Sequence, residues 1–256
     1  MRDPDFGPPS GGHGRERPTE GRSGIDRRTE FRPQVSAGEA ADAPTFETGT
    51  TVVALTAGDG AVMAADRKAS LGGRFTSNKN AEKILGVHPT AAMAISGSVG
   101  PAQSVAETLR AEASLYEARR GESMSMTALS QTAGQLLRGM PVVPLLGGVD
   151  DEGGHVYELD GGGSVMEDAY AAGGSGMQLA YGVLERRYDG VADLADATEA
   201  AVDAVAAASE RDTASGNGVT VATISDEGVA MEAADVADAS ALEPVEESAG
   251  ANGEVA

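Results

Sequence analysis

The sequence predicts an α+β protein built as a four-layer αββα sandwich of two mostly antiparallel sheets. Two observations indicate this fold class. Short apolar segments of β-forming residues come in consecutive groups separated by Gly, Asp and Pro, which favours hairpins over parallel crossovers. Between these groups lie two pairs of longer segments with helical periodicity. If two sheets stack and each outer face carries one helix pair, every predicted element buries its apolar side.

The first group of strands begins with a hairpin. Residues 50–55 (TTVVAL) and 61–66 (AVMAAD) are apolar and rich in β-formers, and Asp59-Gly60 between them is a strong turn signal. Two more strands are predicted at 84–87 and 91–96.

Two helices follow. The first covers 104–120 after Gly100-Pro101, because apolar side chains recur on one face and proline suits a first helical turn. The second is predicted at 126–138, with Ser125 as its N-cap. The remaining elements are strands at 142–149, 155–159, 164–167 and 169–173, helices at 177–188 and 194–210, and closing strands at 219–225 and 229–231.

The two ends of the chain differ from this body in composition. Residues 1–49 are rich in Pro, Gly, Arg and Glu and contain few aliphatic side chains, so they cannot bury enough surface to offset the entropy of ordering. We predict that 1–49 is a disordered leader, 50–231 is the folded domain and 232–256 is an acidic flexible tail.

Acidic residues dominate the chain, because 40 Asp and Glu against 19 Lys and Arg give a net charge of −21. Such a surface repels phosphate backbones and anionic lipids, which argues against nucleic acid or a membrane as a partner. Only three basic residues are lysines, namely Lys68, Lys79 and Lys83. This composition is that of a heavily solvated soluble protein, and it also fits a cytosol rich in salt, where screening weakens self-repulsion.

The sequence also excludes several kinds of site. It has no cysteine, and therefore no disulfide framework, thiolate nucleophile or cysteine-ligated metal. No apolar run approaches the roughly 20 residues that span a bilayer, and the N-terminus lacks an apolar signal core. We therefore expect a cytoplasmic protein that uses no metal and no cofactor.

Most patterns for nucleophilic catalysis are absent as well. The sequence has no GxxxxGK[ST] phosphate loop, no HExxH and no GxSxG elbow, and its histidines (His13, His88 and His155) are far apart. Catalysis then needs a Ser or Thr with another base. A backbone α-amine is suitable, because its pKa of about 8 is near neutrality and threonine paired with an N-terminal amine is an established nucleophile.

Thr50 meets the requirements of that chemistry. It follows Gly49 at the boundary between leader and first strand, so a cut after Gly49 would make it the first residue. Gly49 has no side chain to crowd an attack by the Thr50 hydroxyl. A nearby lysine would keep the α-amine a free base, and a buried lysine needs a carboxylate such as Asp66. The alternative, that the lysines are ordinary surface residues, stays open at this point.

With these residues in view, residues 47–231 resemble the archaeal 20S proteasome β subunit of the N-terminal-threonine hydrolase family. The acidic composition of the chain further resembles that of halophile members of this family. The similarity is carried by ETGTTVV around Thr50, Asp66-Arg67, SNKN before Lys83, ISGSVG at 95–100, LGGVD at 146–150, Gly-Ser-Gly at 174–176 and ERDTASGNG at 210–218. The resemblance implies the N-terminal nucleophile hydrolase fold, a proteasome endopeptidase and an autocleaved propeptide at 1–49.

Roles at matching positions are implied by the same resemblance. Thr50 is the nucleophile with its own amine as base, Lys83 and Asp66 tune that amine, and the Gly97 N–H stabilises the oxyanion. The polar network that holds the amine and Thr50 is formed by Ser175, Asp212 and Ser215.

The resemblance further implies a specificity pocket formed by Ala69, Ile95 and Val99, which are all apolar and favour cleavage after hydrophobic residues. Leu85, Gln103 and a neighbouring subunit also affect its depth. Two features depart from the family pattern: Val52 stands where threonine is usual, and one residue is inserted in the loop at 72–75.

The partners implied are other β subunits in two stacked seven-membered rings, capping α subunits, an indirectly acting regulatory ATPase and unfolded polypeptide substrates. One alternative is the related bacterial-type peptidase with six-membered rings, which ERDTASGNG and the LYEARRGESMS helix disfavour. Another is a catalytically silent ring subunit, which is disfavoured because Thr50 and the lysine are both present.

Overall fold

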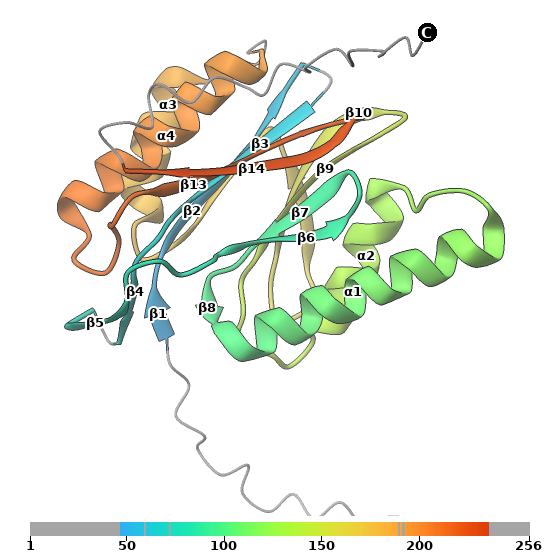
Figure 1. The fold of residues 1–256 in the computed structure, drawn as a ribbon, viewed down its shortest axis with the longest axis horizontal. Coiled ribbons are helices and arrows are strands. Elements are labelled where there is room, and N and C mark those ends of the chain that lie inside the picture. Colours follow the sequence, from blue (N-terminus) through green and yellow to red (C-terminus); the bar gives the residue numbers. More distant parts are fainter. Residues whose placement is uncertain (1–46, 59, 72, 189, 191–192, 236–256) are drawn as a thin grey trace, which may run out of the picture. The chain divides into compact units, whose positions relative to one another are not determined.

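The computed structural model describes residues 47–235, except 59, 72, 189 and 191–192. Within these residues two five-stranded sheets stack face to face, and each carries two helices on its outer side (Figure 1). Every strand pair in them is antiparallel. The predicted four-layer αββα sandwich is therefore confirmed.

The first sheet contains the predicted N-terminal hairpin and the closing strands. Its order is β12 (Tyr170–Gly174), β2 (Thr51–Ala57), β3 (Gly60–Asp66), β13 (Val219–Ser225) and β14 (Gly228–Ala234). The outer face of this sheet packs against α3 (Met177–Arg187) and α4 (Leu194–Arg211). Because α4 buries eight residues that are mostly alanine and valine, it lies close to the strands.

The second sheet holds the middle of the chain. Its order is β11 (Val165–Asp168), β10 (Gly153–Leu159), β9 (Leu145–Asp150), β7 (Ala91–Ala94) and β6 (Ile84–His88). It is covered by α1 (Val99–Arg120) and α2 (Met126–Leu137). The predicted N-cap of α2 is confirmed, because the Ser125 hydroxyl accepts a hydrogen bond from the Ala128 N–H at 3.3 Å.

A third, four-stranded sheet was not predicted. Its order is β5 (Phe75–Asn78), β4 (Ala69–Leu71), β1 (Glu47–Gly49) and β8 (Gly97–Ser98). These strands have two to four residues each and mixed polarity, so their sequences show no alternation of apolar and polar residues that would predict a strand. The strand β1 corrects the prediction that 1–49 is disordered throughout, since pairing on both edges satisfies the backbone of residues 47–49.

Other boundaries also differ from the sequence predictions. Thr50 lies between β1 and β2 instead of starting a strand. The strand β14 continues to Ala234, three residues into the predicted tail, because its backbone pairs with β13 up to that position. The rest of the tail from 236 and the leader at 1–46 lie outside the described residues.

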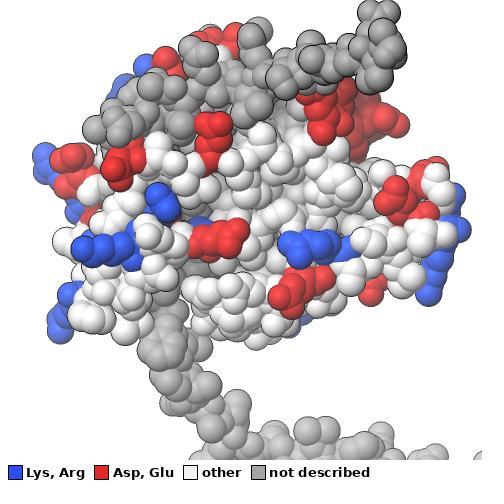
Figure 2. All heavy atoms as spheres, in the orientation of Figure 1, with Lys and Arg blue, Asp and Glu red and all other residues white. Residues whose placement is uncertain are grey.

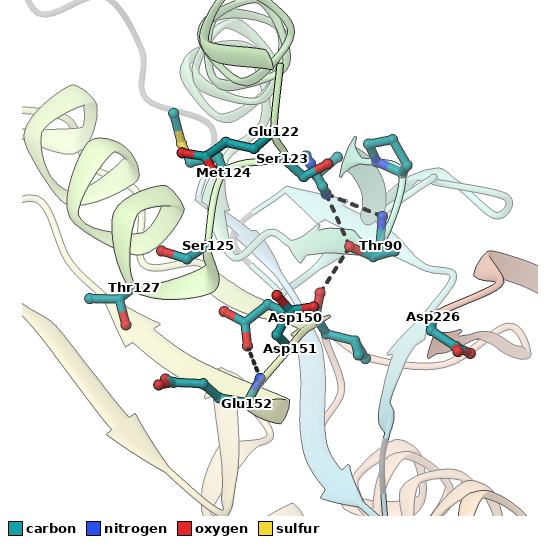
Figure 3. A pocket seen from close by; sticks show the side chains of 13 residues that line it. Thr90, Glu122, Ser123, Met124, Ser125, Thr127, Asp150, Asp151, Glu152 and Asp226 are labelled. Carbon is teal, nitrogen blue, oxygen red and sulfur yellow. Dashed lines mark hydrogen bonds between the residues drawn. The ribbon is translucent and has the colours of Figure 1, made fainter. Parts of the chain in front are cut away.

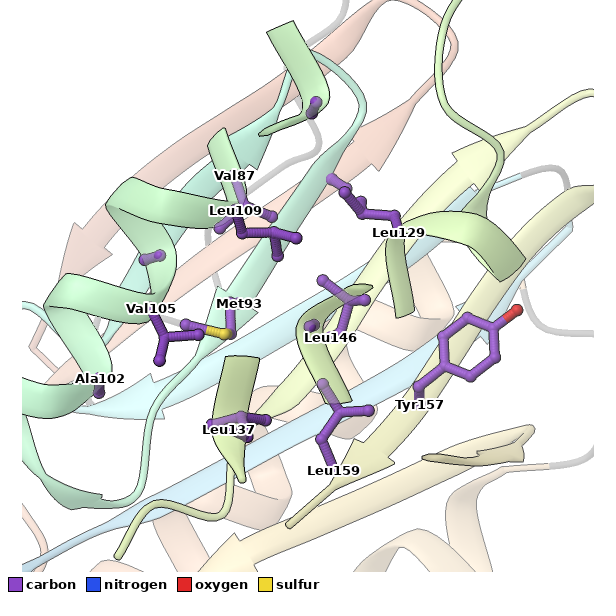
Figure 4. Close-up of a cluster of buried hydrophobic side chains, with 14 of the residues drawn as sticks. Val87, Met93, Ala102, Val105, Leu109, Leu129, Leu137, Leu146, Tyr157 and Leu159 are labelled. Atoms are coloured by element: carbon purple, nitrogen blue, oxygen red, sulfur yellow. The ribbon is translucent and has the colours of Figure 1, made fainter. Parts of the chain in front are cut away.

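The core is aliphatic, as a chain with 4% aromatic residues requires. Between the sheets, alanine, valine, leucine, isoleucine and methionine side chains from both layers form one buried cluster. A second cluster lies under α1 and α2 and includes Leu109, Leu129, Leu146, Leu159 and Met93 (Figure 4). Burying one such side chain stabilises the folded state by about 1.5–3 kcal/mol. This packing holds in place the strands whose ends carry the site.

The face of the molecule shown in Figure 2 carries charges of both signs. Acidic and basic side chains are interspersed there over the described residues. No helix among the described residues is long and apolar enough to cross a membrane.

Candidate active site

Thr50 is buried at the start of the first sheet, with 1% of its surface exposed. Its backbone N–H donates to Ser175 Oγ at 3.2 Å. Its carbonyl oxygen lies 3.3 Å from Ser175 Oγ and accepts from the Gly176 N–H at 3.4 Å. The end of β12 approaches very closely here. A Cβ on Gly174 would lie 2.1 Å from the Thr50 carbonyl oxygen, and its φ of +87° also favours glycine.

An ion pair lies beside the Gly49–Thr50 bond. Lys83 Nζ is 2.6 Å from Asp66 Oδ1, and both side chains are buried. The same ammonium is 3.5 Å from the Gly49 carbonyl oxygen, the group next to Thr50 in the chain. The predicted partnership of lysine and Asp66 is present, and Lys83 is the lysine that forms it.

Backbone donors hold the carboxylate of this pair. Asp66 Oδ1 also accepts from the Thr51 N–H at 2.8 Å, while Oδ2 accepts from the N–H groups of Lys68 at 3.1 Å and Gly216 at 2.9 Å. Buried charges require such compensation, because desolvation without partners is unfavourable by several kcal/mol. Asp66 is thus fixed at the end of β3.

Burial lowers the pKa of Lys83 below its ordinary value of 10.5, although attraction to the Asp66 carboxylate opposes this shift. The proton of Lys83 is therefore held less tightly than that of an exposed lysine.

A second polar network contacts Thr50 through Ser175. Asp212 Oδ2 accepts from Ser175 Oγ at 2.6 Å and from Ser215 Oγ at 2.7 Å. Ser215 Oγ is also 2.7 Å from Thr51 Oγ1. The three residues named from the sequence therefore meet in one network, although they come from the β12–α3 turn and the segment after α4.

The pKa of Asp212 lies below its ordinary value of 3.8. Burial by itself raises this pKa, but the hydroxyls of Ser175 and Ser215 and the Ala214 N–H stabilise the carboxylate and outweigh it. Asp212 is therefore an acceptor at neutral pH.

The strand β1 occupies a slot between two other strands. Thr48 pairs with Leu71 of β4 on one side and with Gly97 of β8 on the other, and Gly49 pairs with Ser70. This is how an extended peptide is held by strand addition, through main-chain hydrogen bonds.

Only glycine fits at the last position of β1. A Cβ on Gly49 would lie 1.9 Å from Ala214 Cβ and 2.9 Å from Ser70 Oγ. The sequence indicated that glycine leaves room for attack, and the structure adds that the surrounding wall leaves no space for a side chain.

A cavity of about 470 Å³ opens beside Thr50. All three predicted pocket residues, Ala69, Ile95 and Val99, line it. It is also lined by Thr50, Leu71, Ser77, Asn78, Ala81, Glu82, Lys83, Gly97 and Gln103. Leu85, which the sequence analysis added as a secondary contributor, is not among the lining residues.

The known proteins that are similar to this chain belong to one family. The family model described as "Proteasome subunit" matches residues 46–224. "Proteasome subunit beta" of Halorhabdus utahensis is 58% identical over 197 residues, which are 75% of this chain and 84% of that protein. "Proteasome subunit beta" of Halobacterium salinarum is 56% identical over 200 residues, covering 77% and 82%. "Proteasome subunit beta 2" of Haloarcula marismortui is 53% identical over 192 residues, covering 74% and 84%.

The chain belongs to the proteasome subunit family.

Within this family the chain is of the halophile-type β class, since the similar proteins named above are β subunits of halophilic archaea. The prediction of an archaeal, halophile-like proteasome β subunit is confirmed. The αββα arrangement is likewise consistent with the N-terminal nucleophile hydrolase fold that the resemblance implied.

In this proteasome subunit the predicted oxyanion residue, Gly97, lies in β8 and lines the cavity beside Thr50. Its φ is +98°, and a Cβ there would lie 2.7 Å from the Pro141 carbonyl oxygen. This position in β8, two residues before α1, therefore requires glycine.

Some residues of this site in the proteasome subunit were not predicted from the sequence. Thr51 contributes both a backbone N–H to Asp66 and a hydroxyl to Ser215, and Ala214 forms the wall against Gly49. Lys68 Nζ donates to the Thr213 carbonyl at 2.6 Å and so braces the segment after α4. A contact made by a backbone group carries no sequence signal, and the scarcity of lysine was the one available pointer to Lys68.

Proposed function

We propose that this chain is the catalytic β subunit of a proteasome core particle and hydrolyses peptide bonds of unfolded proteins as a threonine-type endopeptidase. The observation that carries the proposal is the convergence on one buried bond, Gly49–Thr50, of an ion pair, a hydroxyl–carboxylate network and an open cavity. Thr50 is the nucleophile in this proposal.

The first reaction is removal of the leader, residues 1–49. The Thr50 hydroxyl attacks the Gly49 carbonyl carbon, the C–N bond breaks, and the leader is transferred from nitrogen to oxygen as an ester. Water then hydrolyses that ester, which leaves a carboxylate on Gly49 and a free α-amine on Thr50. The 3.5 Å separation of Lys83 Nζ from the Gly49 oxygen supports this step, since a cation stabilises charge that develops there.

The mature site then acts on other chains. The α-amine of Thr50 takes the hydroxyl proton as the oxygen attacks a substrate carbonyl, and the amine returns a proton to the leaving nitrogen. Lys83, held by Asp66, keeps the amine unprotonated by repulsion of positive charge. Ser175, Asp212 and Ser215 hold the amine and the Thr50 backbone.

The Gly97 N–H stabilises the tetrahedral oxyanion in this scheme, and losing one such donor typically reduces the rate about 100- to 1000-fold. The acyl-enzyme ester is hydrolysed by water. The apolar side chains of Ala69, Ile95 and Val99 beside Thr50 support a preference for cleavage after hydrophobic residues.

A proteasome subunit works within an assembly, and we propose two stacked seven-membered β rings capped by α subunits. A regulatory ATPase delivers unfolded polypeptide to this particle without touching the β site directly. The net charge of −21 supports a salt-rich cytoplasm as its location and argues against nucleic acid and membranes as partners.

Intact-mass measurement of the assembled protein tests this function. The expected mass is that of a chain beginning at Thr50. Thr50→Ala is expected to assemble, to retain residues 1–49 and to lose peptide hydrolysis, because it lacks the attacking oxygen. Thr56→Ala, which removes a hydroxyl that contacts Ala169 and Tyr188 away from the site, is expected to keep its processing. A parent mass that includes the leader would favour a catalytically silent subunit, and peptide hydrolysis by Thr50→Ala would exclude the mechanism.

A further inference from the structure

A cluster of metal-binding side chains lies on the β9–β10 hairpin, which the proposed protease function does not use. Asp150 ends β9, Glu152 lies in the turn and His155 follows in β10. One ligand atom from each lies within 4.8 Å of the other two. Figure 3 shows Asp150 and Glu152 at this turn, on the wall of a cavity of about 780 Å³ below the α1–α2 connection.

The spacing of these atoms fits one small cation. Zinc binds imidazole nitrogen and carboxylate oxygen at about 2.0–2.2 Å, so two of its ligands lie roughly 3–4 Å apart. His155 Nε2 and Asp150 Oδ1 are already 3.0 Å apart. An ion that takes the place of the proton between them therefore needs small side-chain shifts, not a backbone rearrangement.

His155 is oriented as metal-bound histidines usually are. Its Nδ1 is 2.7 Å from Glu167 Oε1 on the neighbouring strand β11, which leaves Nε2 directed at Asp150. A carboxylate on the far ring nitrogen fixes the tautomer and makes the ligating nitrogen more basic. The ring also stacks on Tyr157, with centroids 6.0 Å apart and planes at 11°.

Asp150 is held in place as well. Its Oδ2 accepts from the Met126 N–H at the start of α2 at 2.7 Å, and its Oδ1 accepts from the Glu152 N–H at 2.9 Å. The side chains of Asp150 and His155 are 14% and 13% exposed. Two of the three ligands are therefore ordered by the fold, and the exposed Glu152 is the adjustable third.

We propose that Asp150, Glu152 and His155 bind one divalent transition-metal ion of the Zn²⁺ class, with Glu167 as the outer partner of the histidine. The imidazole selects this class, since Mg²⁺ and Ca²⁺ prefer oxygen ligands alone. Three protein ligands leave a further coordination position for water from the adjoining cavity. The ion would tie β9, β10 and the start of α2 together.

Zinc titration of the assembled, chelator-treated protein tests the site, with calorimetry for affinity and elemental analysis for bound metal. The expected stoichiometry is one Zn²⁺ per chain. Glu152→Gln and His155→Gln are expected to abolish this stoichiometric binding. Glu167→Gln is expected to weaken it about 10- to 100-fold although this residue is not a ligand, as for other outer partners of metal-bound histidine.

Asp151→Asn is the matched control, because Asp151 lines the same cavity one residue from two ligands and does not belong to the cluster. It should bind zinc as the parent does. Circular dichroism of each variant establishes that it is folded. Equal zinc binding by the parent and Glu152→Gln would overturn the site. Mg²⁺ binding that survives His155→Gln would overturn its assignment to a transition metal.

Discussion

At the scale of single residues, Lys83 connects the stability of the protein to its chemistry. Its ammonium is 2.6 Å from Asp66 and 3.5 Å from the Gly49 oxygen, in a place where both charged side chains are buried. A buried pair of this kind contributes little net stability, because desolvation cancels much of the attraction. Its presence in a chain with three lysines therefore fits a functional requirement better than a structural one.

Lys83→Ala is expected to leave the leader attached, because it removes the ammonium that lies 3.5 Å from the Gly49 oxygen. It is also expected to reduce the free energy of unfolding by about 3–5 kcal/mol, since Asp66 would keep a buried, unpaired charge. Intact mass and denaturant unfolding measure the two effects.

Lys79→Ala is the control for this variant. Lys79 is exposed four residues earlier in the chain and has no ion pair among the described residues, so its loss should change neither processing nor unfolding. Normal leader removal by Lys83→Ala would contradict the role given to Lys83.

Asp212 predicts how the site responds to acid. Its folded pKa lies below the ordinary value of 3.8, so the folded state binds its proton less readily than the unfolded state. The stability it contributes is complete above pH 3.8 and is lost as pH falls through the folded pKa. Ser215→Ala removes one stabilising donor and should move acid unfolding to higher pH.

Acid unfolding followed by circular dichroism measures this shift. Ser209→Ala is the control, because that hydroxyl donates to the Val205 carbonyl within α4 and does not reach Asp212. Identical acid transitions for the two serine variants would contradict the stabilisation of Asp212 by Ser215.

At the scale of elements, the short strand β1 is the feature that places Thr50. Its two edges pair with β4 and β8, and Gly49 packs against Ala214 from the segment after α4. The position of the Gly49–Thr50 bond is thus set by three segments that are distant in the sequence.

Gly49→Ala is expected to slow leader removal strongly, since its Cβ would overlap Ala214 Cβ at 1.9 Å and displace β1. Adding Ala214→Gly removes that atom and should restore part of the rate, the remaining neighbours being Ser70 Oγ at 2.9 Å and Ala214 Cα at 3.0 Å. The rate of processing in a time course measures both variants, and non-additivity is the signature of direct contact. Equal rates for Gly49→Ala and the double variant would contradict this packing.

The long periodic elements could be predicted from the sequence, whereas the short strands around the site could not. The helices α2 and α4 have apolar residues at helical spacing, and most strands of the two large sheets are short runs of apolar residues between turn signals. The strands β4, β5 and β8 are two to four residues long, and β1 lies in a polar leader, so their stability comes from neighbours distant in the sequence.

The candidate site was predictable to the extent that its chemistry demands particular side chains. Thr50 and Asp66 follow from the need for a nucleophile and for a counter-ion to a lysine, whereas the family resemblance singled out Lys83 among the three lysines. Ser175 and Asp212 entered through the family resemblance, because no local pattern links residues 37 positions apart. The contributions of Thr51 and Gly216 are made by backbone N–H groups, which every residue except proline has.

At the scale of the whole molecule, the charge of −21 sets the response to salt. Exposed like charges repel one another, and raising the salt from about 0.1 M to 1 M shortens the screening length from roughly 10 Å to 3 Å. The thermal unfolding midpoint is therefore expected to rise over this range. Thermal denaturation in KCl, followed by circular dichroism, measures it.

The exposed acids of α1 provide the control for this effect. The double variant Glu107→Gln and Glu112→Gln carries less negative charge, so its midpoint should rise less with salt than that of the parent. An equal rise would mean that salt acts through hydration of the surface instead of charge screening.

The slot filled by β1 has a kinetic consequence. Under the proposed mechanism, nucleophile and scissile bond belong to one chain, so maturation is a first-order process whose rate does not depend on dilution once the site has formed. Groups held in this way react as though the effective concentration of one toward the other were about 10⁵–10⁸ M. Each copy would therefore begin with a single-use substrate already in its cleft, and its first turnover would clear the position that every later peptide must occupy.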